Sequence, residues 1–128
     1  MSLKDSLRIM VVDDMSTSRA IITNTLDEIG ITQNVAESDP KQALAKLVAN
    51  PVHLVLSDYN MPGMDGLGLL KALRENRSTS RIGFILVTGR ATPQIIQVGQ
   101  KLGLNNLIEK PFTPQKMKAC IERVVGRL

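Results

Sequence analysis

The chain has 128 residues, of which 43% are apolar and only 2% are aromatic, and it carries a formal net charge of +4. This length and apolar content allow one domain with one hydrophobic core and leave no room for a second. The near absence of aromatic side chains argues against base stacking, and the positive charge is not gathered into a dense basic run, so we expect no nucleic-acid partner.

In chain order, short apolar runs alternate with segments of helical periodicity, which is typical of a parallel α/β sheet. The strand candidates are residues 7–12, 34–38, 52–57, 82–87 and 105–109. The first, third and fourth runs are apolar at nearly every position, as expected of strands that are covered on both faces.

Three of the intervening helices are marked by the same signal. A side chain that can cap a helix precedes a proline at the first helical position in Asp39-Pro40, Thr92-Pro93 and Thr113-Pro114. Proline suits that position because its missing N–H would be unsatisfied there in any residue. We therefore expect helices to begin directly after these three pairs.

Two further helices are predicted from periodicity and from glycine. The first follows Ser16 or Thr17 and ends at Gly30, a residue type that favours the left-handed turn after a helix. The second follows the sequence "MDG" at 64–66. The residues we expect it to turn toward the core are Leu69, Leu70 and Leu73.

Five strands and five helices in strict β-α order predict a doubly wound parallel sheet with right-handed crossovers. In such sheets ligands bind beyond the carboxyl ends of the strands, near the point where the strand order reverses. The residues that follow each strand are therefore the candidates for function.

Polar side chains stand at four of these strand ends. Asp13 and Asp14 follow the first strand, Asp58 the third, Thr88 the fourth and Lys110 the fifth. Three neighbouring carboxylates repel one another, which raises their pKa values unless a cation lies between them. Mg²⁺ prefers oxygen ligands and is commonly held by one or two carboxylates and a phosphate oxygen. The sequence therefore predicts a Mg²⁺ site at this edge of the sheet.

The same strand ends indicate phosphoryl transfer. A lysine ammonium and a threonine hydroxyl opposite a metal supply the charge and the donor that phosphoryl oxygens require. Asp58 lies between an apolar strand and the loop "YNMPGMDG", so we expect it to be the fixed central carboxylate and the nucleophile.

The motifs "VVDD", "LSDYNMPGMDG", "LVTG" and "IEKPF" together resemble those of the response-regulator receiver domain, and the resemblance covers essentially the whole chain. It implies the flavodoxin/CheY-like strand order 2-1-3-4-5 and one receiver domain over residues 1–128 without an output domain. Among receivers the chain is most similar to the single-domain, CheY-type regulators of chemotaxis.

The resemblance also implies roles for individual residues. Asp58 resembles the phosphoacceptor. The Mg²⁺ contacts of the family correspond here to Asp13, Asp14, Asp58 and the backbone carbonyl of Asn60. Thr88 and Lys110 resemble the pair that binds the phosphoryl group. The residues expected to govern switching and the lifetime of the phosphoryl group are Leu107, Gly89, Arg90 and Pro111, with Pro111 following a cis peptide bond.

Two of those residues depart from the CheY-type pattern. Leu107 stands where an aromatic residue is usual, three residues before the lysine, and Gly89 follows Thr88 where alanine is common. Arg90 lies two residues past Thr88, beside the path of the water that hydrolyses the phosphoryl group in receivers. These departures predict an altered switching mechanism.

The implied function is that of a phosphoacceptor in two-component signalling. A histidine kinase of the CheA type supplies the phosphoryl group, the flagellar motor switch is the expected output partner, and a phosphatase is a further partner. The chain is not expected to be a conventional enzyme, although it catalyses its own phosphorylation and slow autodephosphorylation. One alternative is a phosphate sink that drains a shared kinase.

A second alternative is a phosphohydrolase of the haloacid-dehalogenase type. That class needs a second acid two residues after the nucleophile, where this chain has Asn60, and an amide cannot act as a general acid. Dinucleotide binding is also disfavoured, because "DDMST" replaces the glycine-rich turn after the first strand.

The remaining features concern the compartment. No apolar run approaches the length of a membrane span, and "MSLKDSLR" lacks the apolar stretch of a signal peptide. The single cysteine, Cys120, cannot form an internal disulfide and lies among apolar helical positions, which fits a core residue in a reducing compartment. We expect a cytoplasmic monomer with no membrane partner.

Overall fold

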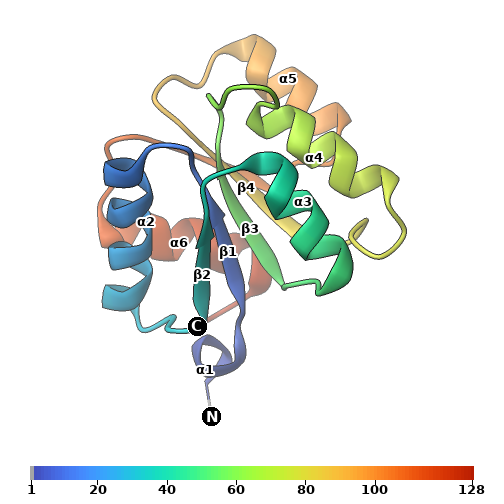
Figure 1. Ribbon diagram of the computed structural model, residues 1–128. Coiled ribbons are helices and arrows are strands. Elements are labelled where there is room, and N and C mark those ends of the chain that lie inside the picture. The colour runs from blue at the N-terminus through green and yellow to red at the C-terminus, as the bar shows by residue number, and fades with distance from the viewer. Residues whose placement is uncertain (1) are drawn as a thin grey trace.

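The computed structural model describes residues 2–128 as a five-stranded sheet with helices on both faces (Figure 1). The strands are β1 (Ile9–Val12), β2 (Asn34–Glu37), β3 (Leu54–Asp58), β4 (Gly83–Thr88) and β5 (Asn106–Glu109). They lie in the order β2-β1-β3-β4-β5, and every neighbouring pair is parallel. The predicted fold class and strand order are confirmed.

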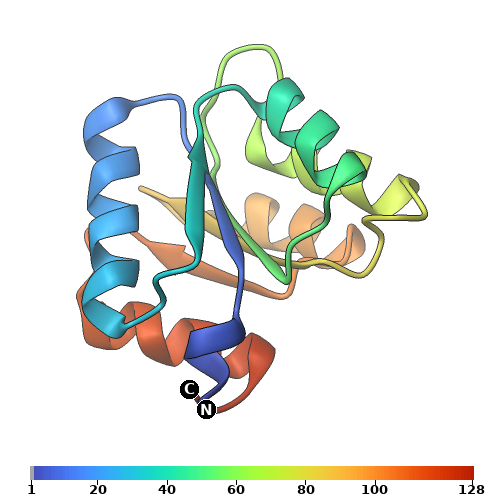
Figure 2. The ribbon, with the colours of Figure 1, turned by 60° about the horizontal axis from the view of Figure 1, so that its bottom comes forward.

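The helices are α1 (Leu3–Ser6), α2 (Ser16–Ile29), α3 (Pro40–Ala49), α4 (Gly66–Glu75), α5 (Pro93–Lys101) and α6 (Pro114–Val125). Figures 1 and 2 show α2 and α6 on one face of the sheet and α3, α4 and α5 on the other. Among residues 2–128 no helix combines the length and the apolar character needed to cross a membrane.

Each face of the sheet has its own apolar cluster. Leu26 of α2 and Ile121 of α6 pack on one side against Ile9, Leu56 and Val87 of the strands. The cluster on the other side contains the three leucines expected to point inward from α4, and all of them are fully buried. The strands β1, β3 and β4 therefore bury apolar side chains on both faces of the sheet, as their sequences predicted.

The prediction of five helices is wrong by one, because the structure adds α1. This helix has four residues, which is shorter than the span over which an apolar stripe can be recognised. A local cap holds it instead: the backbone N–H and the hydroxyl of Ser2 both donate to Asp5 Oδ2, at 3.2 and 3.1 Å. The backbone N–H of Leu7 still donates to the carbonyl of Leu3, so β1 begins at Ile9 and not at residue 7.

The three helices predicted from a capping side chain and a proline begin where expected, whereas α2 begins at Ser16, with Met15 at its N-cap, and not after Ser16 or Thr17. Asp39 accepts a hydrogen bond from the N–H of Lys41, and Thr92 and Thr113 accept from backbone N–H groups in the first turns of α5 and α6. At the other end of α2, Gly30 has a φ of 99°, the left-handed conformation that glycine adopts without steric penalty. These local signals fix where the chain leaves the sheet and returns to it.

Two side chains complete the structural framework. Arg74 is half-buried and links two loops, because its guanidinium donates to the carbonyls of Ser80, Ile82 and Gly103 and to Asn105 Oδ1. Cys120 is buried, as expected, and burial raises the pKa of its thiol to about 11. The thiol is therefore protonated and unreactive at neutral pH.

Candidate functional site

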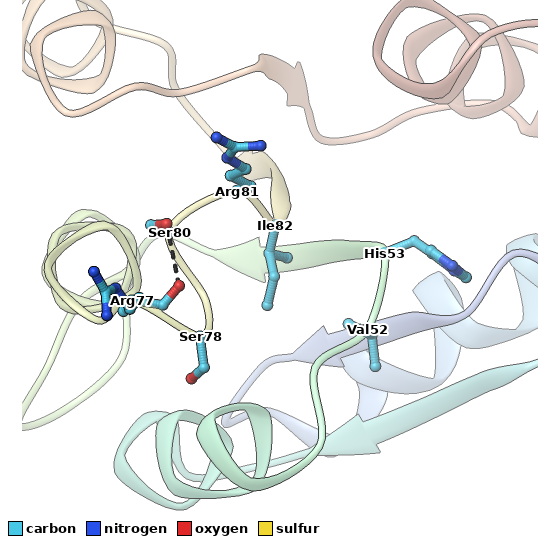
Figure 3. Close-up of a pocket in the computed structure, with 7 residues that line it drawn as sticks. All are labelled: Val52, His53, Arg77, Ser78, Ser80, Arg81 and Ile82. Atoms are coloured by element: carbon cyan, nitrogen blue, oxygen red, sulfur yellow. Dashed lines mark hydrogen bonds between the residues drawn. The ribbon is translucent and has the colours of Figure 1, made fainter.

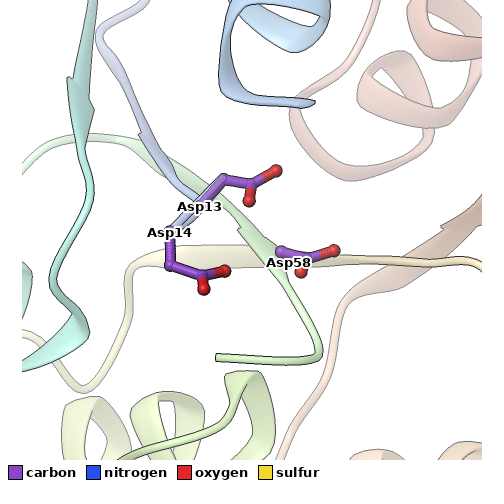
Figure 4. Close-up of side chains that lie close together, drawn as sticks. All are labelled: Asp13, Asp14 and Asp58. Carbon is purple, nitrogen blue, oxygen red and sulfur yellow. The ribbon is translucent and has the colours of Figure 1, made fainter. Parts of the chain in front are cut away.

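The three predicted carboxylates meet at the carboxyl ends of β1 and β3. Asp13 and Asp14 directly follow β1, Asp58 is the last residue of β3, and these two strands are paired. Each side chain offers one carboxylate oxygen, and the three oxygens lie within 4.8 Å of one another (Figure 4). Asp13 and Asp58 are buried while Asp14 is exposed. The predicted convergence is confirmed.

Asp13 is held rigidly but keeps one oxygen without a partner. Its Oδ1 accepts from the N–H of Met15 at 3.0 Å, and its backbone carbonyl accepts from Arg19 Nη1 at 2.9 Å. Its Oδ2 is buried and accepts no hydrogen bond from any described residue. A buried carboxylate oxygen without a donor is costly, so this atom marks a place for a cationic ligand.

Lys110 directly follows β5, and its side chain reaches the carboxylate cluster. Its ammonium donates to Asp58 Oδ1 and to Ser18 Oγ, both at 2.8 Å, and lies 3.8 Å from Asp13 Oδ2. The peptide bond between Lys110 and Pro111 is cis, as the resemblance implied. The backbone N–H of Lys110 donates to the carbonyl of Thr88, which fixes the lysine against the end of β4.

Ser18 was not among the predicted site residues. It lies in the first turn of α2, where the sequence "STSR" reads as an ordinary helix start. No spacing rule connects it with Lys110, which is 92 residues away in the chain. Only the packing of α2 against the sheet brings the two side chains together.

Thr88 reaches the predicted edge of the sheet but its hydroxyl faces its own loop. The side chain is buried at the end of β4, one residue past Val87, which pairs with Asp58. Its Oγ1 donates to the backbone carbonyl of Arg90 and accepts from the N–H of the same residue, both at 3.2 Å. The single hydroxyl proton is therefore engaged away from the carboxylates.

The pKa of Asp58 is raised, as the sequence predicted, although repulsion is not the main cause. Burial is the largest contribution, because it penalises the charged carboxylate, and the charges of Asp13 and Asp14 add to it. The hydrogen bond and the charge of Lys110 act in the opposite direction. The pKa is raised because the Lys110 ammonium does not fully offset the burial of the carboxylate and the smaller contributions of the two neighbouring aspartates.

The residues expected to control switching and lifetime lie around this centre. Leu107 is half-buried in β5 and packs with the apolar cluster that contains α4 and α5. Arg90 is exposed, and a side chain added at Gly89 would meet nothing within 4 Å. Asn60 is an exposed loop residue two positions past Asp58. The functional roles of these residues stay predictions.

A pocket at the opposite end of β3 and β4 is not a better candidate. It has a volume of about 670 Å³ and is lined by Val52, His53, Arg77, Ser78, Ser80, Arg81 and Ile82. Figure 3 shows the two arginine side chains pointing in different directions, and His53 pointing away from both. Its charged groups therefore do not converge on a common ligand.

The carboxylate cluster suits Mg²⁺. Its donors are hard oxygens from three side chains, and the unpartnered Asp13 Oδ2 supplies a buried negative charge that a divalent ion would satisfy. Thiol and imidazole groups, which softer metals prefer, are absent from this set of three aspartates. The donor chemistry therefore fits the metal predicted from the sequence.

We expect Mg²⁺ to raise the free energy of unfolding by about 2.7 kcal/mol at a concentration one hundred times its Kd, because the ion binds the assembled cluster and not the unfolded chain. In EDTA, where no ion compensates the carboxylates, ionisation of Asp58 lowers the free energy of unfolding. The raised pKa of Asp58 means that stability falls as the pH rises from the unfolded-state pKa through the folded-state pKa.

Urea unfolding at several pH values, with EDTA or with Mg²⁺, measures both effects. The variant that combines Asp13→Ala with Asp58→Ala should lose the Mg²⁺ increment and should be at least as stable as the wild type in EDTA. A double variant that is less stable in EDTA would show that these carboxylates act as structural hydrogen-bond partners.

The chain is similar to known proteins over most of its length. The model of the response regulator receiver domain matches residues 9–122. The chain is 41% identical over 128 residues to the "Probable chemotaxis protein CheY" of Rhizobium etli, covering 100% of this chain and 99% of that protein.

Two solved structures show the same fold. Chemotaxis protein CheY4 of Vibrio cholerae superposes with a TM-score of 0.85 and 28% identity, over 92% of this chain and 98% of that one. The receiver domain of the sensor histidine kinase PA1611 of Pseudomonas aeruginosa, solved with a magnesium ion in its active-site cleft, gives a TM-score of 0.84 at 22% identity, over 94% and 98% of the two chains.

Proposed function

The chain belongs to the response regulator receiver family, and from that membership we propose that Asp58 accepts a phosphoryl group from a phosphohistidine of a kinase. Phosphorylation then changes the affinity of the chain for a partner protein. The observation that carries this proposal is the position of Asp58, a buried carboxylate at a strand end, 2.8 Å from the Lys110 ammonium and next to two further aspartates. The haloacid-dehalogenase alternative is set aside because of the family membership.

The transfer moves a phosphoryl group between two nucleophiles. A carboxylate oxygen of Asp58 forms a bond to phosphorus while the bond from phosphorus to the imidazole nitrogen breaks, and the nitrogen keeps the electron pair. Lys110 already holds Asp58 Oδ1, which leaves the second oxygen for the attack. The ammonium also supplies a positive charge for the phosphoryl oxygens as negative charge develops on them.

Thr88 would contribute only after a local change. Its hydroxyl proton is donated to the carbonyl of Arg90, so it must leave this acceptor before it can donate to a phosphoryl oxygen. The loop residue between them, Gly89, has open space around it and allows the movement. The hydroxyl thereby couples phosphorylation to the position of the loop after β4.

Asp13, Asp14, Asp58 and the backbone carbonyl of Asn60 would hold Mg²⁺. When bound, the ion supplies positive charge opposite the lysine, where it lowers the repulsion between the carboxylates and an incoming phosphoryl group. The PA1611 receiver domain supports this assignment, because that protein coordinates magnesium in its active-site cleft.

The chain would act as its own catalyst and not as an enzyme with an external substrate. It promotes its own phosphorylation and, through water, slow loss of the phosphoryl group. The proposal is tested by incubating the protein with Mg²⁺ and a small phosphodonor, reducing the acyl phosphate with borohydride and locating the modified residue by peptide mass spectrometry. Modification at any residue other than Asp58 would contradict it.

The relatives support a place in chemotaxis, since the matched proteins of R. etli and V. cholerae are chemotaxis proteins. We therefore take a CheA-type histidine kinase as the phosphodonor and the flagellar motor switch protein as the partner, in the cytoplasm, with a phosphatase as a further partner. A pull-down on the motor switch protein, with and without a phosphoryl analogue, separates this role from a phosphate sink. A sink would show fast phosphotransfer and no such binding.

Arg90→Ala should change the lifetime of the phosphoryl group without stopping phosphorylation. The Arg90 side chain is exposed two residues past Thr88, where a long cation can obstruct or reorient the attacking water. Decay of the labelled protein after removal of the donor measures the lifetime. Identical decay rates in the variant and the wild type would assign Arg90 to the solvated surface.

Leu107→Ala should lower the free energy of unfolding by about 1–2 kcal/mol, less than for a fully buried leucine, because the side chain is only half-buried. Phosphotransfer should survive, and partner affinity should change only modestly. Gly89→Val should instead weaken phosphorylation-dependent binding. Valine fits the open space but stiffens the loop that Thr88 must move.

Partner affinity with and without a phosphoryl analogue, measured in both variants, tests this division of roles. If Leu107→Ala removes the difference in affinity and Gly89→Val keeps it, then Leu107 is the switch and the loop is not.

A further inference from the structure

Among residues 2–128, Ser18 is the one neutral side chain that binds the Lys110 ammonium. It lies half-buried in the first turn of α2, and its hydroxyl oxygen accepts a hydrogen bond from Lys110 Nζ at 2.8 Å. The bond joins α2 to the end of β5 across 92 residues of chain. It adds an acceptor to the site without adding a charge.

The three protons of the ammonium have unequal partners. Asp58 Oδ1 and Ser18 Oγ each take one at 2.8 Å, whereas Asp13 Oδ2 lies 3.8 Å away, beyond hydrogen-bond distance. That oxygen is buried and accepts no hydrogen bond from residues 2–128, and its ion pair with Lys110 is a long one. An ammonium released from Ser18 would therefore turn toward Asp13, where a charge-assisted hydrogen bond is available.

We propose that Ser18 is a positioning residue that holds Lys110 away from Asp13 and so keeps Asp13 Oδ2 available to Mg²⁺. The inference deepens the proposed function and rests on it for the assignment of the carboxylate cluster as the metal site. Without the hydroxyl, the lysine itself neutralises the oxygen that the ion requires, and Mg²⁺ binds more weakly.

Few other acceptors surround Ser18. The two side chains line a pocket of about 490 Å³ whose other walls include Met15, Thr17, Ile21 and Phe112. Thr17 is the one further side chain of this lining with an oxygen that could accept a proton from the ammonium, and it is exposed to solvent. Asp13 Oδ2, buried and 3.8 Å from Lys110 Nζ, is therefore the acceptor that a released ammonium would reach.

Titration calorimetry of Mg²⁺ alone into the full chain tests the inference without any phosphoryl transfer. Ser18→Ala should raise the Kd for Mg²⁺ by about tenfold, as loss of an outer partner of a metal site does. Ser18→Thr keeps the acceptor and should stay within about twofold of the wild type. The control is Thr23→Ala, which removes a hydroxyl from the same helix that bonds only the carbonyl of Ala20.

A double-mutant cycle separates positioning from structure. In a Lys110→Met background the ammonium is gone, so adding Ser18→Ala should leave the Kd for Mg²⁺ unchanged. Equal weakening with and without the ammonium would overturn the inference, because Ser18 would then act on the fold of α2. An unchanged Kd in Ser18→Ala alone would also overturn it.

The inference and the proposed function fail in different ways. A wild-type chain that binds no Mg²⁺ would overturn the metal assignment and this inference with it. Mg²⁺ binding that depends on Ser18, in a chain whose Asp58 is never phosphorylated, would overturn the proposed function alone.

Discussion

Asp58→Asn should abolish phosphorylation completely. The amide is neither charged nor nucleophilic enough to attack phosphorus. Asparagine has nearly the same shape as aspartate and keeps an oxygen for the Lys110 ammonium. The variant should therefore fold normally while its phosphorylation falls to background.

Intact mass after incubation with Mg²⁺ and a small phosphodonor measures this result, and the same samples can be tested with a cognate kinase. The matched control is Asp39→Asn, which changes a carboxylate at the amino-terminal cap of α3. Asparagine caps a helix as well as aspartate does, so this variant should be labelled like the wild type. Persistent stoichiometric labelling of Asp58→Asn would remove Asp58 as the phosphoacceptor.

The sequence predicted the sheet edge well because its signals are local. Asp39, Thr92 and Thr113 cap their helices beside prolines, and these caps fix where each crossover begins. The strand order followed from the family resemblance and not from these signals. Once the strands are parallel and ordered, their carboxyl ends must share one edge, so Asp13 and Asp58 had to meet there.

What the sequence could not predict depends on which side chain meets which across the fold. The hydrogen bond between Ser18 and Lys110 requires the first turn of α2 to lie level with the loop that follows β5, and no periodicity encodes that position. The four acceptors of Arg74 come from two separate loops. The hydroxyl of Thr88 has two possible directions, and only the structure shows that it faces Arg90. Local sequence patterns predict which residues lie at the edge of the sheet, whereas side-chain rotamers and helix packing determine which of them form hydrogen bonds with one another.

Gly66→Ala should destabilise the chain by about 1–2 kcal/mol, although helix propensity predicts the opposite. Gly66 is the first residue of α4, and its φ is not positive, so the backbone conformation does not require glycine. Alanine in place of glycine inside a helix would by itself contribute up to about 1 kcal/mol of stability. Only the space around the residue argues against the change.

That space is closed by atoms that cannot move aside easily. A Cβ at residue 66 would lie 2.5 Å from the backbone oxygen of Asp58 and 2.6 Å from Leu86 Cδ1. Leu86 is fully buried in β4, and the Asp58 oxygen belongs to the end of β3. Relief therefore requires α4 to shift away from the sheet or the end of β3 to bend, and overpacking of this kind costs about 1–3 kcal/mol.

The clash lies against Asp58, so Gly66→Ala should also slow phosphorylation and weaken Mg²⁺ binding, because the nucleophile moves with its carbonyl. Gly68→Ala is the matched control in the same helix. A Cβ there would approach Met64 Cγ at 3.2 Å, and methionine is flexible enough to yield. Urea unfolding should show Gly68→Ala near the wild type and Gly66→Ala well below it. If both variants are as stable as the wild type and label equally fast, the close approach of α4 to the end of β3 does not position Asp58.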